Sequence, residues 1–359
     1  MEVGVTMADA PVYSPTGKVI SKTANWMRKC NVKIYAHTKD VSNASSDAST
    51  YAQQFAKPNE GDVVMDVSSL RCTFDIKRFA LMGYPNTALI KIYNLNVPTE
   101  NSIIAEGYRV TVDAGYPDLY GRIFDGTIIF PTRWKENGTD YVLEILAIDG
   151  DDFLTDTYCT FNYTRKQTIR SVVETMAKQG GIDLDPNVSA ALDKTLTKGG
   201  VVNGAPKNIL NDIAKSINGT WYIDSGKLYV FAYSDDVSKL PFGLEAVELS
   251  EKTGLIGTPQ QNGQGVNARS LLNPKMVPYS LAHISNDKII QQLPTFASYS
   301  QPPSQVYPLD PQGIYRIITV NFIGDTRGGE GSPWYSDINT VYQSGDIIQT
   351  MENLFGTIN

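Results

Sequence analysis

Histidine is scarce in this chain of 359 residues, and its scarcity limits the chemistry that the chain can perform. The two histidines, His37 and His283, have no second histidine, cysteine or paired carboxylate at the spacing of metal ligands. A zinc site is therefore not expected. A serine hydrolase is not expected either, because the chain lacks a Gly-x-Ser-x-Gly motif. We interpret His283 as an ordinary strand residue and expect no cofactor.

Cysteine is also rare. The three cysteines are odd in number and far apart in sequence, so neither a disulfide framework nor a zinc motif is supported. We expect buried thiols at Cys30, Cys72 and Cys159. One acidic cluster could suggest calcium, but it lacks the glycine and glutamate that an EF-hand loop requires. We interpret it as a solvated turn; its members are Asp149, Asp151, Asp152 and Asp156.

Long apolar runs and an excess of positive charge are absent as well. No run approaches the roughly 18 residues that a membrane span requires, and the N-terminus lacks a charged segment followed by an apolar one. We therefore expect folding in a cytosol without stable membrane insertion. A net charge of -7 disfavours a protein that holds nucleic acid, because neutralising phosphates needs clustered Lys and Arg. A conduit that only passes DNA should be acidic or neutral.

Residues suited to strands, turns and interfaces are abundant. The chain has 20 tyrosines, 29 glycines and 19 prolines, and only 19% of its residues are charged. Tyrosine-rich surfaces with few charges are often buried in interfaces. The length suggests two or three domains.

The first half of the chain contains clear strand patterns. Thr87–Asn94 alternates apolar and polar residues with period two. Asn137-Gly138 is suited to a type I′ turn between strands at Ile128–Glu136 and Asp140–Asp149. The second of these strands is apolar at most positions, which predicts that both of its faces are covered.

Between these strands we expect a short helix. Thr99–Glu106 would turn Ile103 and Ile104 inward, and Gly107 would end the helix in a left-handed conformation. Two further strand candidates follow, with a turn between them: Tyr108–Ala114 and Gly121–Phe130, with the turn at Gly115–Pro117.

The middle of the chain switches from period two to period 3.6, which indicates a small α+β domain. Thr164 and Gln167 resemble a capping box before a helix that ends at Gly180-Gly181. A second helix begins near Pro206. A hairpin then pairs two short strands across Ser225-Gly226: Trp221–Asp224 and Lys227–Phe231.

The period-two pattern returns after this insert. Four strands are expected, with a glycine-rich loop between the first two; the strands are Ala246–Leu249, Val266–Leu271, Ser280–Ile284 and Gly313–Phe322, and the loop is Gly254–Gly265. The fold class is therefore mainly β with an α+β insert. The predicted segments are an arm (1–25), a first β domain (26–160, with a surface spacer at 40–61), the insert (161–238), a second β domain (239–343, with a Pro-rich excursion at about 285–311) and a tail (344–359).

An ordered set of short motifs resembles the baseplate hub protein of contractile-tailed, Mu-like bacteriophages. The first motifs are Ser69-Leu70-Arg71-Cys72-Thr73-Phe74, Ile92-Tyr93-Asn94-Leu95, Ala114-Gly115-Tyr116, Ile123-Phe124-Asp125-Gly126 and Ala147-Ile148-Asp149-Gly150-Asp151. The later motifs are residues 206–213, Gly254-Leu255-Ile256-Gly257 with Pro259, Leu271-Leu272-Asn273-Pro274, and Gly324-Asp325-Thr326-Arg327-Gly328 before Trp334. Together they cover roughly residues 26–343.

The resemblance implies an architecture and a set of partners. The two β regions would be tube-protein-like β-barrel or sandwich domains, and three chains would form a pseudo-sixfold ring around a DNA channel. This homotrimer would adapt the hexameric tail tube protein to the trimeric central spike protein. Baseplate wedge or adaptor proteins and the tape-measure protein would be further partners. The protein would be part of the virion, assembled in the host cytoplasm.

No catalytic, metal-binding or cofactor-binding residue is predicted. Four glycines are assigned to tight backbone geometry: Gly115, Gly126, Gly257 and Gly324. Two alternative functions stay open, a cell-surface-binding tail protein and a peptidoglycan-degrading hub. In the second case Asp149 or Glu174 would be candidate acids, because the two carboxylates of a glycosidase need only be close in space.

Overall fold

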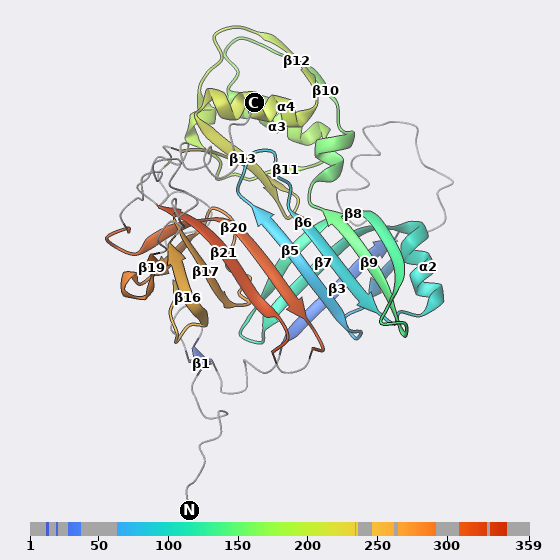
Figure 1. Ribbon diagram of the computed structural model, residues 1–359. Coiled ribbons are helices and arrows are strands. Elements are labelled where there is room, and N and C mark those ends of the chain that lie inside the picture. The colour runs from blue at the N-terminus through green and yellow to red at the C-terminus, as the bar shows by residue number, and fades with distance from the viewer. Residues whose placement is uncertain are drawn as a thin grey trace, which may run out of the picture.

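A computed structural model describes residues 12–13, 19–20, 28–36, 63–233, 235, 246–261, 265–291, 309–328 and 331–342. Most of the arm, the spacer at 40–61, most of the Pro-rich excursion and the tail at 344–359 lie outside these residues, as do His37 and Trp26. The described chain is mainly β with a helical insert, which confirms the predicted fold class (Figure 1). A separate ribbon is formed by β1 (Val12–Tyr13) and β2 (Val19–Ile20).

One large sheet of fourteen strands dominates the structure. Its strands from the first half are β3 (Lys29–Ala36), β4 (Val63–Asp66), β5 (Cys72–Phe79), β6 (Thr87–Tyr93), β7 (Gly107–Tyr116), β8 (Leu119–Glu136) and β9 (Asp140–Ile148). Those from the second half are β15 (Val247–Leu249), β16 (Leu255–Gln261), β17 (Val266–Leu271), β18 (Leu281–Ile284), β19 (Ile290–Gln291), β20 (Ile314–Asp325) and β21 (Trp334–Tyr342). The order is β19-β16-β17-β21-β20-β5-β6-β9-β8-β7-β3-β4, with β18 paired to β20 and β15 to β18.

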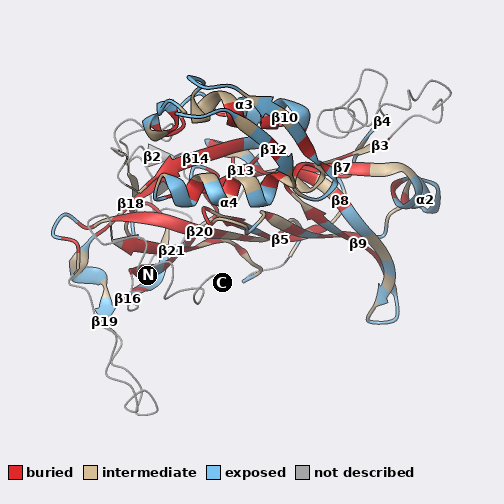
Figure 2. Cartoon of the chain, turned by 90° about the horizontal axis from the view of Figure 1, so that it is seen from above, coloured by how far each residue is buried: buried red, intermediate tan, exposed pale blue. Residues whose placement is uncertain are grey.

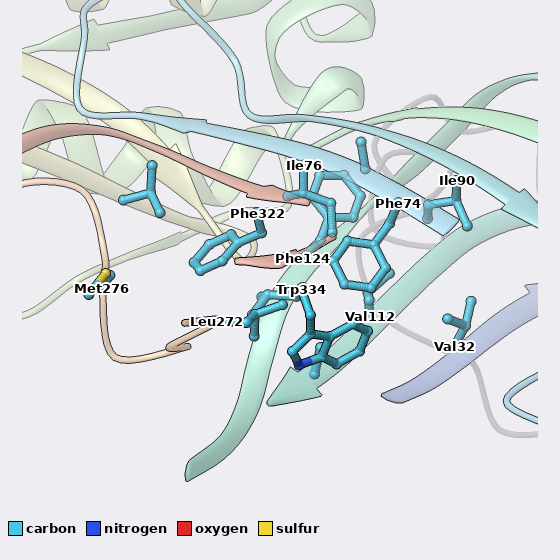
Figure 3. Packing of buried hydrophobic residues seen from close by; sticks show 14 of the residues in the cluster. Val32, Phe74, Ile76, Ile90, Val112, Phe124, Leu272, Met276, Phe322 and Trp334 are labelled. Atoms are coloured by element: carbon cyan, nitrogen blue, oxygen red, sulfur yellow. The ribbon is translucent and has the colours of Figure 1, made fainter. Parts of the chain in front are cut away.

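The two halves join where β20 pairs with β5. Seven residue pairs connect these strands, from Thr319↔Phe79 to Asp325↔Thr73. The halves also share one hydrophobic core, in which Phe74 of β5 packs edge-on against Trp334 of β21 with ring centroids 5.5 Å apart. Figure 3 shows both rings close to Phe322. Sheet and core are thus continuous across the expected domain boundary, so the division into two tube-like domains stays a prediction.

The β8–β9 hairpin forms as predicted. Asn137 and Gly138 have φ angles of 49° and 78°, which suit a type I′ turn. One expectation for β9 is met only in part within the single chain: Val142 is fully buried, but Leu146 on the same face is 39% exposed, so the second face of this strand is partly covered.

The helix α2 (Val97–Glu106) is longer than predicted and begins at the N-cap Asn96, whose side chain accepts a hydrogen bond from the Thr99 amide. Ile103 is buried, but Ile104 is 41% exposed, so the inward placement of both was wrong. Gly107 has φ -70° and does not adopt the left-handed conformation. A Cβ atom there would lie 2.6 Å from the Ile103 carbonyl oxygen, and this close approach explains the glycine.

The turn between β7 and β8 is shorter and later than expected. It consists of Pro117 and Asp118, and the predicted turn residues Gly115 and Tyr116 belong to β7.

The insert forms a separate layer above one end of the sheet (Figure 1). Its elements are β10 (Cys159–Tyr163), α3 (Ile169–Gln179), β11 (Asp183–Leu184), the 3-10 helix Ala190–Asp193, β12 (Gly200–Gly204), α4 (Pro206–Ser216), β13 (Gly219–Asp224) and β14 (Lys227–Ala232). A short π-helix at Asp152–Asp156 leads into it. The insert has its own core, built mainly from the apolar stripes of α3 and α4 and from the β13–β14 hairpin.

The helix α3 begins about one turn later than the predicted capping box. The Thr164 amide does donate to Gln167 Oε1 at 2.7 Å, but the helix begins only at Ile169. Its N-cap is Thr168, whose hydroxyl accepts a hydrogen bond from the Ser171 amide at 3.2 Å.

Three strands of the second half were not predicted, and one of them, the short β19, lies within the expected Pro-rich excursion. The expected loop at Gly254–Gly265 contains β16, and β21 was missed altogether. In β16 a register irregularity lies between Ile256 and Gln260, at the position of Gly257 and Pro259.

Candidate assembly surface

Eight neighbouring strands of the large sheet form a continuous antiparallel wall. We define the wall as β16, β17, β21, β20, β5, β6, β9 and β8. Each strand is antiparallel to the next, including the pair β20–β5 that joins the two halves. One face of the wall packs on the shared core. The other, which we call the outward face, is covered at some positions, such as Val142 and Val341, and exposes side chains at others, such as Leu89 and Leu146.

An apolar row crosses the outward face at one end of the wall. Leu89 of β6 is directly opposite Leu146 of β9, which in turn is opposite Phe130 of β8. Their exposed fractions are 37%, 39% and 63%. Figure 2 shows the far end of the β8–β9 hairpin as exposed, whereas strand β20 is largely buried. Because a monomeric soluble protein seldom exposes contiguous apolar side chains, this row is a candidate contact surface.

Three cations of the outward face form ion pairs with carboxylates. Lys91 and Glu144 approach to 3.5 Å between Nζ and Oε2, across β6 and β9. At the other end of the wall, Arg269 Nε donates to Asp337 Oδ1 at 2.6 Å, and the Arg269 guanidinium also stacks on the Tyr335 ring.

A third pair follows the same pattern. Arg71 Nη2 lies 2.8 Å from Asp325 Oδ2, on the neighbouring strand β20. The guanidinium holds the pKa of Asp325 below its ordinary value, against the opposing effect of burial. Three cations of this face are therefore matched by carboxylates, whereas Lys77 of β5 is exposed without an ion pair in the described chain.

Both outer strands of the wall have stretches with a partner on one side only. The strand β8 pairs with β7 up to Thr127, and from Ile128 to Glu136 it pairs with β9 alone among the described residues. The strand β16 pairs with β19 only at Gln260 and Gln261. Unpaired strand edges are ready to pair with another chain unless they are blocked.

A buried polar cluster fastens the insert to the sheet. Arg78 of β5 is 3% exposed, and its guanidinium forms two hydrogen bonds with the carboxylate of Asp224 in β13, one of them at 2.9 Å from Nε to Oδ1. Asn86 Nδ2 donates to the same carboxylate at 2.9 Å and to the Ile223 carbonyl at 3.0 Å. A buried charge needs such a partner, because leaving it alone in the interior is costly.

Asp149 belongs to this cluster. It is 2% exposed and accepts hydrogen bonds from the Ser225 and Gly226 amides at 2.6 and 3.1 Å. Burial, followed by the nearby Asp224 carboxylate, raises the pKa of Asp149 to about 8, whereas the two amides lower it less strongly. The expectation of a solvated turn is therefore wrong for Asp149, which anchors the β13–β14 turn.

Asp152 and Asp156 of the acidic cluster and the candidate acid Glu174 have different environments. Asp152 is half-buried, and burial raises its pKa to about 6 although the Thr127 hydroxyl donates to it at 3.1 Å. Asp156 and Glu174 are exposed. In the described residues there is no group of three or more His, Cys, Asp or Glu side chains that could hold a metal ion.

The four glycines are restricted either in backbone conformation or in the space around them. Gly115 and Gly257 have φ angles of 147° and 70°, a region that side chains rarely adopt. A Cβ atom on Gly126 would lie 2.7 Å from the Ile148 carbonyl oxygen, and one on Gly324 would lie 2.2 Å from the Phe74 ring. Gly126 itself lies in regular register opposite Val110.

The described histidine, the cysteines and two tryptophans contact other parts of the fold. His283 lies in β18 and contacts the Glu248 carboxylate through Nδ1. Cys72 and Cys159 are buried, as predicted, whereas Cys30 is only half-buried. Trp221 and Trp334 lie in the two cores. In the part of the chain with assigned structure, no helix is both long and apolar enough to cross a membrane.

A solved structure of a phage tail protein has a similar fold, and two further solved structures match over most of the chain. A 43 kDa tail protein of prophage MuSo2 from Shewanella oneidensis matches 79% of this chain and 95% of its own, at 9% identity and a TM-score of 0.50. A tail protein from Neisseria meningitidis matches 77% of this chain and 93% of its own, at 11% identity and a TM-score of 0.47. A type VI secretion system component from Escherichia coli matches 76% and 73%, at 11% identity and a TM-score of 0.46.

The family model for the baseplate hub gp41 matches residues 54–282. The chain therefore belongs to the baseplate hub gp41 family, which confirms the resemblance seen in the sequence motifs. It is a structural component of a phage tail baseplate. No curated protein sequence matches the chain.

Proposed function

We propose that three copies of this chain form a ring of six similar units that adapts the hexameric tail tube to the trimeric central spike. The observation that carries this proposal is the eight-stranded antiparallel wall. Four of its strands come from each half of the chain: β16-β17-β21-β20 from the second half and β5-β6-β9-β8 from the first. Strand direction alternates along the wall, so the two sets of four run in the same sequence of directions.

The even number of strands in the wall allows a ring to close. A unit with an even number of alternating strands begins and ends in opposite directions, so identical units can continue the antiparallel pattern indefinitely. The open stretch of β8 would then face the open stretch of β16 in the next copy. Phe130 and Ile256 project from these stretches on the outward face and are 63% and 39% exposed. Pro131 and Pro259 lack amide donors there, so we expect side-chain packing to contribute more than ladder hydrogen bonds.

In this ring the outward face of the wall would line the channel. Its three ion pairs suit a passage for DNA, because retention of DNA depends on unpaired cations that neutralise phosphates. We propose no catalytic role: Asp149, one of the two candidate acids, holds a backbone turn at the insert junction. Wedge or adaptor proteins and the tape-measure protein are further proposed partners, with assembly in the host cytoplasm.

Light scattering on the purified protein, alone and with its spike protein, tests the proposal. We expect a mass three times that of the monomer. Phe130→Asp should abolish this species, because burying the exposed part of the ring, on the order of 100 Å², contributes about 2.5 kcal/mol at each subunit contact. That loss weakens each contact by well over tenfold.

Tyr158→Asp is the matched control. Tyr158 is 66% exposed but lies at the start of the insert, away from the wall, so this variant should assemble normally. A wild-type protein that stays monomeric with its spike would contradict the proposal. So would a Phe130→Asp variant that trimerises as well as the control.

A further inference from the structure

A groove of about 390 Å³ crosses the insert between the β10–β12 ribbon and the helices α3 and α4. We call it the insert groove. Its lining residues are Tyr163, Ile169, Val172, Leu196, Val201, Val202, Asn203, Ile209, Asp212, Ile213 and Ser216. It lies in the layer farthest from the large sheet, so the wall and its core play no part in forming it (Figure 1).

The floor of the insert groove is apolar and incompletely covered. Ile169, Ile209 and Ile213 pack against the insert core but are only partly buried, and Val201 of β12 is 63% exposed. Ile209 and Ile213 are four residues apart on α4 and therefore lie on one side of the helix. A ridge of apolar side chains with spacing three or four fits such a groove.

The rim of the groove is positively charged. Arg165 and Lys166 precede α3, Lys198 follows Leu196, and Lys215 is next to Ser216 at the end of α4; all four side chains are exposed. In the part of the chain that the structure describes, none of the four forms an ion pair. The only charged residue in the lining itself is Asp212. An occupant with negative charge is therefore favoured.

The last described strand ends near the C-terminal end of α4. Val341, near the end of β21, belongs to a small cluster against which Tyr233 packs. The Tyr233 amide donates to the Asn218 carbonyl at 3.0 Å, and Asn218 is only two residues beyond Ser216 of the groove lining. The chain beyond Tyr342 thus starts close to the C-terminal end of α4.

The sequence that follows has the features that the groove requires. In residues 343–359, apolar side chains recur at helical spacing: Ile347, Ile348, Met351, Leu354, Phe355 and Ile358. The segment contains two acidic residues, Asp346 and Glu352, and no basic ones. Four residues between Tyr342 and Ile347 span up to about 14 Å when extended. Ten helical residues would then cover about 15 Å, roughly the length of α4.

We propose that residues 343–359 bind in the insert groove of their own chain, with the apolar ridge on the floor and the acidic residues toward the basic rim. This interaction clamps the second β half to the insert from the side opposite the buried Arg78–Asp224 pair. It does not depend on trimer formation, so it can be tested on any oligomeric form.

The test uses a chain that ends at Tyr342 and a fluorescent peptide of residues 343–359. We expect the peptide to bind the shortened chain and to bind the full-length chain at least about tenfold more weakly, since the full-length groove is already occupied. Ile213→Asp in the shortened chain should weaken binding at least about tenfold. Val97→Asp, at a 59% exposed position on α2, is the matched control and should bind as before.

A second pair of variants keeps the test decisive if Ile213→Asp unfolds the insert. Lys166→Glu and Lys215→Glu change exposed side chains on the rim, and together they should weaken peptide binding several-fold and reduce its salt dependence. Equal binding of the peptide to the full-length and shortened chains would overturn the proposal, because the groove would then be open to another occupant. Absence of binding to the folded shortened chain would overturn it as well. If full-length protein excluded the peptide only at concentrations where it oligomerises, the segment would come from a neighbouring copy, and occupation within one chain would be wrong.

Discussion

Replacing Asp149 by asparagine should remove the contribution of this residue to the pH dependence of the insert junction. The Asp149 carboxyl has a pKa of about 8 in the folded protein, against an ordinary value of 3.8, chiefly because of burial. The folded state therefore binds this proton more tightly than a state in which the β13–β14 hairpin has opened. The resulting stabilisation is complete below pH 3.8 and is lost as pH rises toward 8.

The size of the effect follows from linkage. Between the two pKa values, each pH unit removes up to about 1.4 kcal/mol, which is a tenfold change in the opening equilibrium. From pH 5 to pH 7 the loss should approach about 2.7 kcal/mol, or nearly 100-fold. In Asp149→Asn only one of the two amides keeps an oxygen acceptor, because Ser225 and Gly226 donate to different carboxylate oxygens. This variant should therefore be destabilised by an amount that does not change with pH, since no proton is taken up or released.

Hydrogen exchange at the Ser225 and Gly226 amides measures this opening directly. The ratio of protection in wild type to protection in Asp149→Asn cancels the intrinsic pH dependence of exchange, and it should fall by up to tenfold per pH unit between pH 5 and pH 7. Asp156→Asn, which changes an exposed carboxylate, is the control. The ratio of protection in wild type to protection in Asp156→Asn should stay constant over this pH range. A wild-type to Asp149→Asn ratio that stays constant over this range would refute the reasoning.

Three further substitutions test packing, ion pairing and capping. Gly324→Ala should cost about 1–3 kcal/mol in unfolding free energy, because the new methyl group would lie within the Phe74 ring. Arg78→Met should cost about 3–5 kcal/mol by leaving Asp224 as an uncompensated buried charge. Thr168→Ala should cost about 1 kcal/mol through loss of the α3 N-cap. Chemical denaturation followed by circular dichroism measures all three.

Each of these variants has a comparison that isolates its cause. Gly121→Ala places its methyl group 3.4 Å from Pro274, an ordinary contact, and should be nearly neutral. Adding Asp224→Leu to Arg78→Met should recover part of the lost stability; no recovery would contradict the ion-pair explanation. Thr164→Ala should lower the unfolding free energy less than Thr168→Ala does. The reverse order would indicate that Thr164, and not Thr168, is the N-cap of α3.

Local patterns predicted the elements that form from local interactions. The β8–β9 hairpin, the helix α4 and the β13–β14 hairpin are all at the expected positions, since turn residues and helical spacing act over a few residues. The strand β21 was missed because Ser336 and Thr340 replace apolar residues on its inner face. Both are buried, and their hydroxyls bond to Asn273 and Val266 of the opposite segments, which no sequence pattern reveals.

The candidate sites depended on contacts between distant residues. Arg78, Asn86, Asp149 and Asp224 come from four separate elements, and each alone resembles a polar residue at a strand end. The only sequence signal for Asp149 was its place directly after an apolar strand. The apolar outer face of β9 was recognised, but a sequence does not say whether such a face is covered by its own chain or by another copy.

The pairing of β20 with β5 can form only late in synthesis. The partner of Phe79 is Thr319, which the ribosome adds about 240 residues later. At roughly 5–20 residues per second, the edge of β5 stays without its neighbour for about 10–50 s. During that interval the nascent first half presents Phe74 with no Trp334 to cover it, so this edge is where a holding chaperone would act and where premature contact between nascent chains would begin.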